Sequence, residues 1–344
     1  MRAILLAAAS VVALASSAWS AEYPILDVAA VPNLSAQGRL TYERFVLMSL
    51  PRTFALAPSG VSAWLSGGTS AAGNRDKALA NCEQAAKAPC AVYAQDLQVV
   101  ARPVALPNAP APWISTGSYA FVPDNRYFWH GPGAAAGVYV WGHGNNGPQD
   151  VRGLQPQPHV RAFNNAGFDI LRFDRDPSND YPDNAKAWLR DGLAKLRANG
   201  YRKIIAGGQS RGAWAALQAL AIPGLVDGAI AISPASQNVN ALYMQRAELQ
   251  RLLGDAASPA ARVVVAEFAG DGFVGDPDQR TADIKEGLAP RVAALMLINR
   301  PAGFEGHGGG ATAKFAVEYG PCIYRFVLGL SGACAAPTVQ VSGR

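Results

Sequence analysis

The sequence predicts an α/β protein with a mostly parallel sheet flanked by helices, preceded by a small α+β unit. In the second part of the chain, short apolar strand segments alternate with helical segments, which is typical of repeated βα units and a sheet covered on both faces. The helical segment 185–198 carries an apolar stripe from Ala185 to Leu196 with charged residues opposite. A proline-rich stretch at 103–112 separates this pattern from the first part of the chain and indicates a domain boundary.

The first elements form a predicted ββαβ unit. Segments 53–57 and 61–65, joined by a turn that contains glycine, predict a β-hairpin. A helix follows, with Leu79 and Cys82 on its apolar face, and then a short strand at 90–94.

After the proline-rich stretch the elements alternate regularly. Strands are predicted around Tyr139 and at 168–173, 203–206, 229–232, 263–269 and 293–298, and helices at 159–166, 185–198, 213–221, 240–253 and 281–288, before a terminal helix. Because Gly320-Pro321 lies inside that terminal helix, we expect a kink or a restart there.

The N-terminus has the pattern of a secretory signal peptide. Met1-Arg2 precedes an apolar run at 3–15, which is too short to span a bilayer, and small residues precede Ala21. We therefore expect export to a periplasm or the medium, without stable membrane insertion. The expected organisation is a signal peptide at 1–20, a small α+β domain at 21–102, a linker at 103–112 and a catalytic domain at 113–337.

Charge and cysteine content narrow the class of protein further. The formal net charge is +5, but basic residues are scattered among acidic ones, so a nucleic-acid groove is not expected. Export favours oxidised cysteines, and four of them allow three connectivities. The local pairs would be Cys82 with Cys90 and Cys322 with Cys334. Neither spacing resembles a zinc site, and no metal is expected.

One motif points to nucleophilic catalysis. Ser210 lies between Gly208 and Gly212, directly after the strand at 203–206 and directly before a helix. This is the G-x-S-x-G nucleophile elbow in the strand-to-helix context that it requires, with glycines because strand and helix approach closely.

A serine nucleophile needs a base, and the chain has four histidines. In proteins with this elbow the acid and then the His follow the Ser along the chain. His307 alone follows Ser210, and we expect it to be the base. His130 is interpreted as structural, His159 as a solvated helix residue and His143 as a residue that shapes a loop.

The catalytic acid of the triad is expected at the carboxyl end of the strand 263–269. Asp271 lies at its carboxyl end, where catalytic groups gather in open α/β sheets, and is preferred. Asp276 is the alternative acid, although an Asp before Pro277 is a normal helix cap. Glu267 lies inside the strand and is a poor candidate.

Two backbone amides are expected to stabilise an oxyanion. One is the amide of Arg211, at a helix N-terminus directly after the nucleophile. The other is the amide of Asn145, in the His143-Gly144 loop that follows a strand.

Together these residues resemble the α/β-hydrolase superfamily over residues 115–330, about two thirds of the chain. The pattern is similar to lidless secreted esterases and dienelactone-hydrolase-like proteins. The resemblance implies an α/β-hydrolase fold with little or no lid, since the segment 233–263 holds one predicted helix where many relatives insert a lid.

The resemblance implies an exported serine hydrolase that cleaves carboxylic esters through an acyl-enzyme, with Ser210, His307 and Asp271 as its triad and without a cofactor. Its expected partner is a small-molecule ester or a similar acyl substrate. A peptidase or a lactone hydrolase would use the same residues. A non-catalytic envelope binding protein on a hydrolase frame is the alternative from another class, and a partner of the N-terminal domain is not identified.

Overall fold

A computed structural model describes residues 22–108, 110–111, 113–147, 149–236, 241–332, 334 and 338–342. The chain divides into two compact units. The first comprises residues up to Pro107 together with Arg126–Phe128 and Arg161–Gly167, and the second comprises the rest. The expected boundaries are therefore incomplete, because two later segments belong to the first unit. The expected signal peptide at 1–20 lies outside the described residues.

The first unit is an α+β structure around a four-stranded sheet of order β2-β1-β3-β4. Its strands are β1 (Arg52–Leu56), β2 (Ser62–Ser66), β3 (Ala91–Gln95) and β4 (Gln98–Val99), with α3 at Ala71–Ala86. β1 and β2 form the antiparallel hairpin that the sequence predicts. The prediction missed α2 (Ala36–Phe45), whose Tyr42 and Phe45 are buried in an aromatic core with Phe54.

Short 3-10 helices and one short α-helix complete this unit. They are η1 (Pro24–Leu26), η2 (Val28–Ala30) and α4 (Arg161–Asn164). Phe128, from one of the later segments, stacks on Tyr23 with ring centroids 4.0 Å apart. The core of the first unit is thus built from chain segments that are far apart in the sequence.

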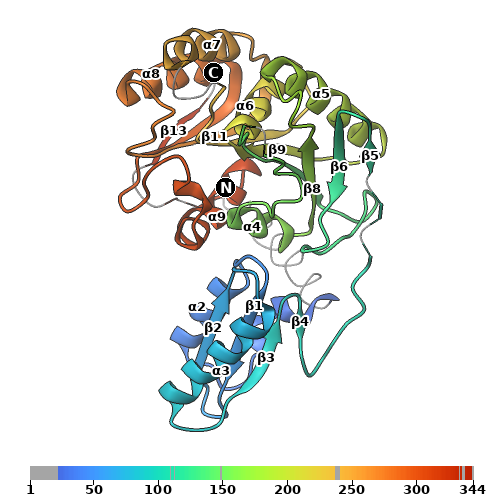
Figure 1. Cartoon of the computed structure of the whole chain (residues 1–344), viewed down its shortest axis with the longest axis vertical. Coiled ribbons are helices and arrows are strands. Elements are labelled where there is room, and N and C mark those ends of the chain that lie inside the picture. Colours follow the sequence, from blue (N-terminus) through green and yellow to red (C-terminus); the bar gives the residue numbers. More distant parts are fainter. Residues whose placement is uncertain are drawn as a thin grey trace, which may run out of the picture. The chain divides into compact units, whose positions relative to one another are not determined.

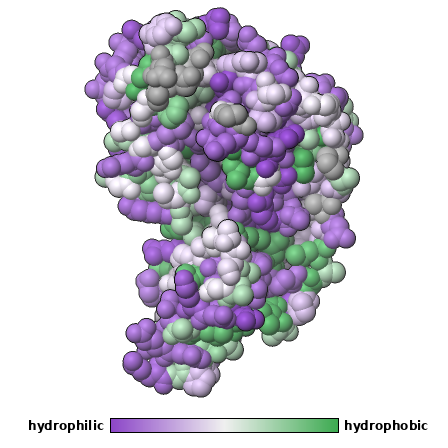
Figure 2. Space-filling view, in the orientation of Figure 1, coloured by the Kyte–Doolittle hydropathy of each residue, from purple (hydrophilic) through white to green (hydrophobic). Residues whose placement is uncertain are grey.

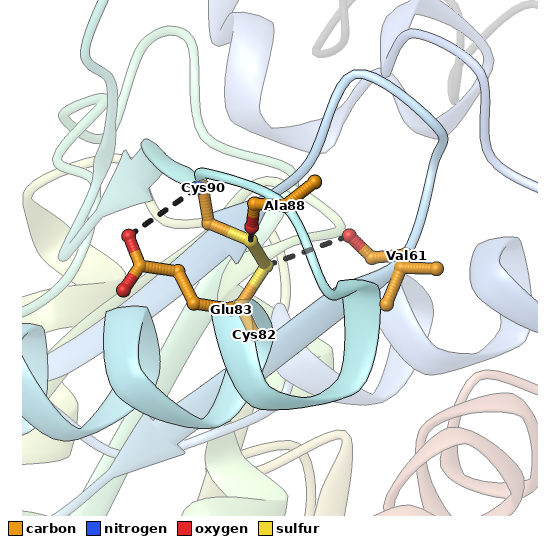
Figure 3. Close-up of a disulfide and its surroundings, with 5 residues drawn as sticks. All are labelled: Val61, Cys82, Glu83, Ala88 and Cys90. Atoms are coloured by element: carbon orange, nitrogen blue, oxygen red, sulfur yellow. Dashed lines mark hydrogen bonds between the residues drawn. A yellow bond between two sulfur atoms is a disulfide. The ribbon is translucent and has the colours of Figure 1, made fainter.

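Both disulfides are the local pairs. Cys82 and Cys90 join the end of α3 to the chain just before β3 (Figure 3). Cys322 and Cys334 join the last helix to the segment that follows it. Each bridge closes a short loop inside one unit, so each restricts the unfolded chain locally.

The second unit contains a nine-stranded sheet of order β13-β12-β11-β10-β9-β7-β8-β6-β5 (Figure 1). The strands are β5 (Ile114–Ser115), β6 (Tyr119–Pro123), β7 (Gly137–Gly142), β8 (Phe168–Arg175), β9 (Ile204–Gln209), β10 (Gly228–Ile232), β11 (Ser258–Glu267), β12 (Val292–Asn299) and β13 (Thr338–Ser342). The six neighbouring strands in the middle of the sheet, β12, β11, β10, β9, β7 and β8, pair in parallel. The edge strands β13, β6 and β5 pair antiparallel.

Helices cover both faces of this sheet. They are η3 (Pro158–Val160), α5 (Pro182–Ala198), α6 (Arg211–Gln218), η4 (Ala219–Ala221), α7 (Leu242–Gly254), α8 (Pro277–Leu288), η6 (Ala289–Arg291), η7 (Gly309–Ala311) and α9 (Ala313–Val327). The largest apolar cluster joins α5, α6, α7 and α8 to one face of the sheet, and the predicted stripe of α5 points into it. The α/β-hydrolase fold class is confirmed, and α7 is the one described helix between β10 and β11.

Three details differ from the predictions. The antiparallel edge strands β5, β6 and β13 were not expected, and β13 lies beyond the expected domain end at residue 337. α9 runs through Pro321 as one continuous helix. The sequence pattern did not reveal β5 and β13 because a short edge strand shows little alternation of apolar and polar residues. Its formation depends on pairing with the neighbouring strand.

The interpretation of His159 as a solvated residue is wrong. Its side chain is fully buried and contacts the hydroxyl of Tyr139 on β7 through Nε2 at 3.3 Å. Its ring also meets Phe315 of α9 edge to face. Burial without a charged partner lowers the pKa of His159 to about 3.

Few large apolar side chains are exposed on the described surface of the second unit. Leu154, Tyr181, Tyr243 and Met244 are the exposed ones. The face of this unit seen in Figure 2 is largely hydrophilic, with small separate hydrophobic areas. Among the described residues, no helix is both long and apolar enough to cross a bilayer.

We predict that His159 makes the folded state sensitive to acid. Because its pKa is lower in the folded state than in the unfolded state, its contribution to stability is complete above about pH 6.5 and is lost as the pH falls toward 3. The unfolding free energy of His159→Gln, measured by urea titration from pH 7.5 to 4, should fall less steeply than that of the wild type, by up to about 1.4 kcal/mol per pH unit. Parallel curves for the two proteins would contradict this.

Candidate active site

Ser210 forms a one-residue turn between β9 and α6. Its backbone has φ 54° and ψ −118°, a conformation that residues with a side chain rarely adopt. Its amide donates to the carbonyl of Ile232 on β10 at 3.0 Å, and its carbonyl accepts from Trp214 of α6 at 2.9 Å. Neighbouring elements therefore hold the strained turn on both sides.

Gly208 and Gly212 allow this turn because they pack directly on Gly142 of β7. A Cβ atom on Gly212 would lie 2.0 Å from the Gly142 carbonyl oxygen, and one on Gly208 would lie 2.3 Å from the same atom. These distances are impossible for a side-chain carbon. Only glycine lets α6 lie this close to β7 and β9, which is the physical requirement that the motif indicated.

His307 and Asp271 are brought together by loops that follow adjacent parallel strands. His307 Nδ1 lies 2.9 and 3.0 Å from the two carboxylate oxygens of Asp271. The Asp271 side chain is 1% exposed and also accepts a hydrogen bond from the amide of Phe273 at 2.9 Å. An ionised carboxylate at this position favours a proton on Nδ1, which leaves Nε2 with its lone pair.

The second ring nitrogen of His307 is buried and has no hydrogen-bond partner among the described residues. Phe273 packs against the imidazole with ring centroids 4.2 Å apart. The His307 carbonyl accepts from the side chain of Gln209, next to Ser210, at 3.2 Å. No hydrogen bond joins Ser210 to His307 Nε2 in the described part of the chain. Such contacts are often long before substrate binds.

The two other acidic candidates have different roles. Asp276 caps α8, where its side chain accepts from the amides of Asp278 and Gln279. Glu267 is buried and pairs with Arg280 at 2.9 Å. The structure therefore brings Asp271 to His307 and leaves the alternative, Asp276, at a helix end.

His143 is buried in the loop that follows β7. Its Nε2 accepts from the Arg175 amide at 3.3 Å, and its Nδ1 lies 2.6 Å from the Gly144 carbonyl. These contacts fit a neutral ring with the proton on Nδ1. Burial and the nearby Arg175 charge lower the pKa of His143 to about 3. His143 thus contacts the backbone around its loop, in a neutral form.

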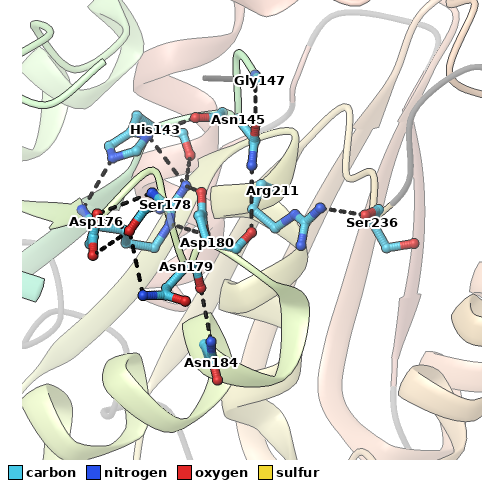
Figure 4. Close-up of polar contacts among 12 residues, drawn as sticks. His143, Asn145, Gly147, Asp176, Ser178, Asn179, Asp180, Asn184, Arg211 and Ser236 are labelled. Carbon is cyan, nitrogen blue, oxygen red and sulfur yellow. Dashed lines mark hydrogen bonds and ion pairs between the residues drawn. The ribbon is translucent and has the colours of Figure 1, made fainter. Parts of the chain in front are cut away.

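A buried ion pair beneath this loop was not anticipated. Arg175, at the end of β8, contacts both carboxylate oxygens of Asp180, at 2.8 and 3.1 Å, and also donates to the His143 carbonyl. Asp174, one residue earlier on β8, pairs with Arg172 and accepts a hydrogen bond from the amide of Gly153 at 3.4 Å. The one sequence feature that could have pointed to the ion pair with Asp180 is the position of Arg175 at the end of a strand. Figure 4 shows the polar contacts around His143 and Asp180.

Asn145 and Arg211 line the same pocket as Ser210. The Asn145 side chain accepts from the amide of Gly147 at 2.7 Å, which shapes the turn that carries the Asn145 amide. Arg211 is the first residue of α6, so its amide is at the positive end of the helix dipole.

This pocket, here called the Ser210 pocket, has a volume of about 590 Å³. It is lined by Asn145, Asn146, Gly147, Pro177, Ser178, Asp180, Tyr181, Pro182, Ser210, Arg211, Ala235, Ser236 and Phe273. Sequence reasoning missed Tyr181 and Phe273, which reach the pocket from loops. In the described part of the chain no group of three or more His, Cys, Asp or Glu side chains is arranged to hold a metal ion.

The similarity of this chain to known proteins is low. No family model matches the sequence, and no curated protein matches it. Among solved structures, the Pyrococcus furiosus esterase Pf2001 is similar, with 15% identity and a TM-score of 0.43 over 62% of this chain and 87% of that chain. The fold class stated above follows from the sheet order and the elbow.

We predict that Gly212→Ala destabilises the protein. The added carbon would overlap backbone atoms that no side-chain rotation can move, so the unfolding free energy should fall by about 1–3 kcal/mol or more. Gly254→Ala is the matched control, because nothing lies within 4 Å of its Cβ position in α7. That control should be neutral or slightly stabilising in urea titrations. Equal effects of the two changes would argue against close packing at the elbow.

Proposed function

We propose that this protein is a serine hydrolase that cleaves carboxylic esters through an acyl-enzyme. The observation that carries the proposal is the strained Ser210 elbow together with the His307–Asp271 contact at the same edge of the sheet. Strain at a single serine between a strand and a helix is typical of functional sites.

Each residue has a defined role in the proposed reaction. Ser210 attacks the acyl carbon while His307 Nε2 takes its proton, and the same proton then passes to the leaving alcohol. Asp271 holds the imidazole and stabilises its charged form. The amides of Arg211 and Asn145 would donate to the oxyanion, and water would then hydrolyse the acyl-enzyme by the same route.

We further propose that the protein is exported. The pattern of residues 1–20 supports this, and the two disulfides are compatible with an oxidising compartment. A peptidase or lactone hydrolase would use the same residues. Comparing esters, amides and lactones with the same acyl group would separate these activities.

A fluorophosphonate probe should form an adduct on Ser210. Peptide mapping of the labelled mature protein would locate the adduct, and Ser210→Ala should lose at least about 10⁴-fold in ester turnover. Folded protein that takes no label, or a variant that keeps its turnover, would favour the non-catalytic binding protein.

Asp271→Asn should lower kcat by about 10³ to 10⁴, because an amide in place of the carboxylate favours the wrong tautomer of His307. Asp276→Asn is the matched control, since Asn caps helices as well as Asp does. Its kcat should equal that of the wild type. A larger loss in Asp276→Asn than in Asp271→Asn would reverse the assignment of the acid.

A further inference from the structure

Two side chains that line the Ser210 pocket carry a formal charge, Asp180 and Arg211. The Asp180 carboxylate is neutralised by Arg175, which contacts both of its oxygens. Arg211 has no ion pair among the described residues. The pocket wall therefore has one positive charge beside the nucleophile that forms no ion pair with a carboxylate of the described chain.

The Arg211 guanidinium uses one nitrogen for a protein contact. Its Nη2 donates to the backbone carbonyl of Ser236 at 2.5 Å (Figure 4). Its Nε and Nη1 are buried and have no hydrogen-bond partner in the described part of the chain. The neighbouring Glu248 carboxylate accepts from the Ser236 hydroxyl at 2.6 Å.

This arrangement is unfavourable in the absence of a ligand. A buried N–H of a charged group that lacks a hydrogen-bond partner loses its hydration without compensation. Burial accordingly lowers the pKa of Arg211 from its ordinary value, since the nearby carboxylates oppose the effect only in part. Because the guanidinium donates to the protein through one nitrogen, its unused N–H groups can serve an anionic oxygen in the pocket.

We propose that Arg211 recognises a carboxylate on the substrate, so that the preferred substrates are esters that carry a negative charge. This inference rests on the function proposed above. Arg211 adjoins the nucleophile in the sequence and shares its pocket, so the recognised carboxylate belongs to the same small molecule as the ester bond. A guanidinium is suited to this task because it stays charged and presents several donors to a carboxylate.

The test compares esters that differ in charge. Ethyl pentanoate is the neutral reference. Monoethyl glutarate places a carboxylate on the acid side of the ester bond, and O-pentanoyl glycolate places one on the alcohol side. The wild type should show a kcat/KM for one of the two anionic esters at least about tenfold above that for the neutral one. In Arg211→Gln this ratio should fall toward one, and in Arg211→Lys it should recover in part.

A matched control separates recognition from general charge. Arg152, in the loop after β7, is exposed and pairs with Asp150. Arg152→Gln removes one positive charge from this loop and should leave the anionic-to-neutral ratio at its wild-type value. An equal ratio in wild type and Arg211→Gln for both anionic esters would overturn the proposal, as would an equal loss in Arg152→Gln. If no ester is hydrolysed and Ser210 takes no fluorophosphonate, the proposed function itself fails.

Discussion

The contact between Gly142, Gly208 and Gly212 is the constraint on which the rest of the site depends. Because these residues lack Cβ atoms, α6 lies directly on β7 and β9, and Ser210 is left in a strained turn between strand and helix. The turn determines the direction of the α6 dipole and the position of the Ser210 hydroxyl. The loops that carry Asn145, Asp271 and His307 are arranged around this fixed point.

Buried ion pairs hold those loops in place. Arg175 and Asp180 support the loop after β7, while Arg280 pairs with Glu267 at the end of β11 and also donates to the Pro234 carbonyl. The residue after Pro234 donates its amide to the Ser210 carbonyl. Such pairs add little net stability because their desolvation is costly, but each fixes one geometry.

Arg211 is different from these paired arginines. Arg175 and Arg280 meet carboxylates of the chain, whereas Arg211 donates to a single carbonyl and has two buried nitrogens without partners. Arg211 therefore lacks the carboxylate partner that Arg175 and Arg280 have, and in the proposal above a substrate carboxylate takes that place. The same residue would then provide a backbone donor for the oxyanion and a side chain for substrate recognition. Stabilisation of the reaction intermediate and choice of substrate would both depend on the first residue of α6.

The sequence by itself determined the order of βα units and the elbow with its glycines, because each depends on residues close together in the chain. It left three disulfide connectivities open, and the structure has the local one. The sequence also singled out Asp271 and His307, which follow strand ends, although their catalytic roles stay predictions. Only the tertiary structure decided that His159 is buried, that Arg175 meets Asp180, that Phe273 packs on His307 and that β13 extends the sheet. These features depend on contacts between different elements, and local periodicity carries no information about such contacts.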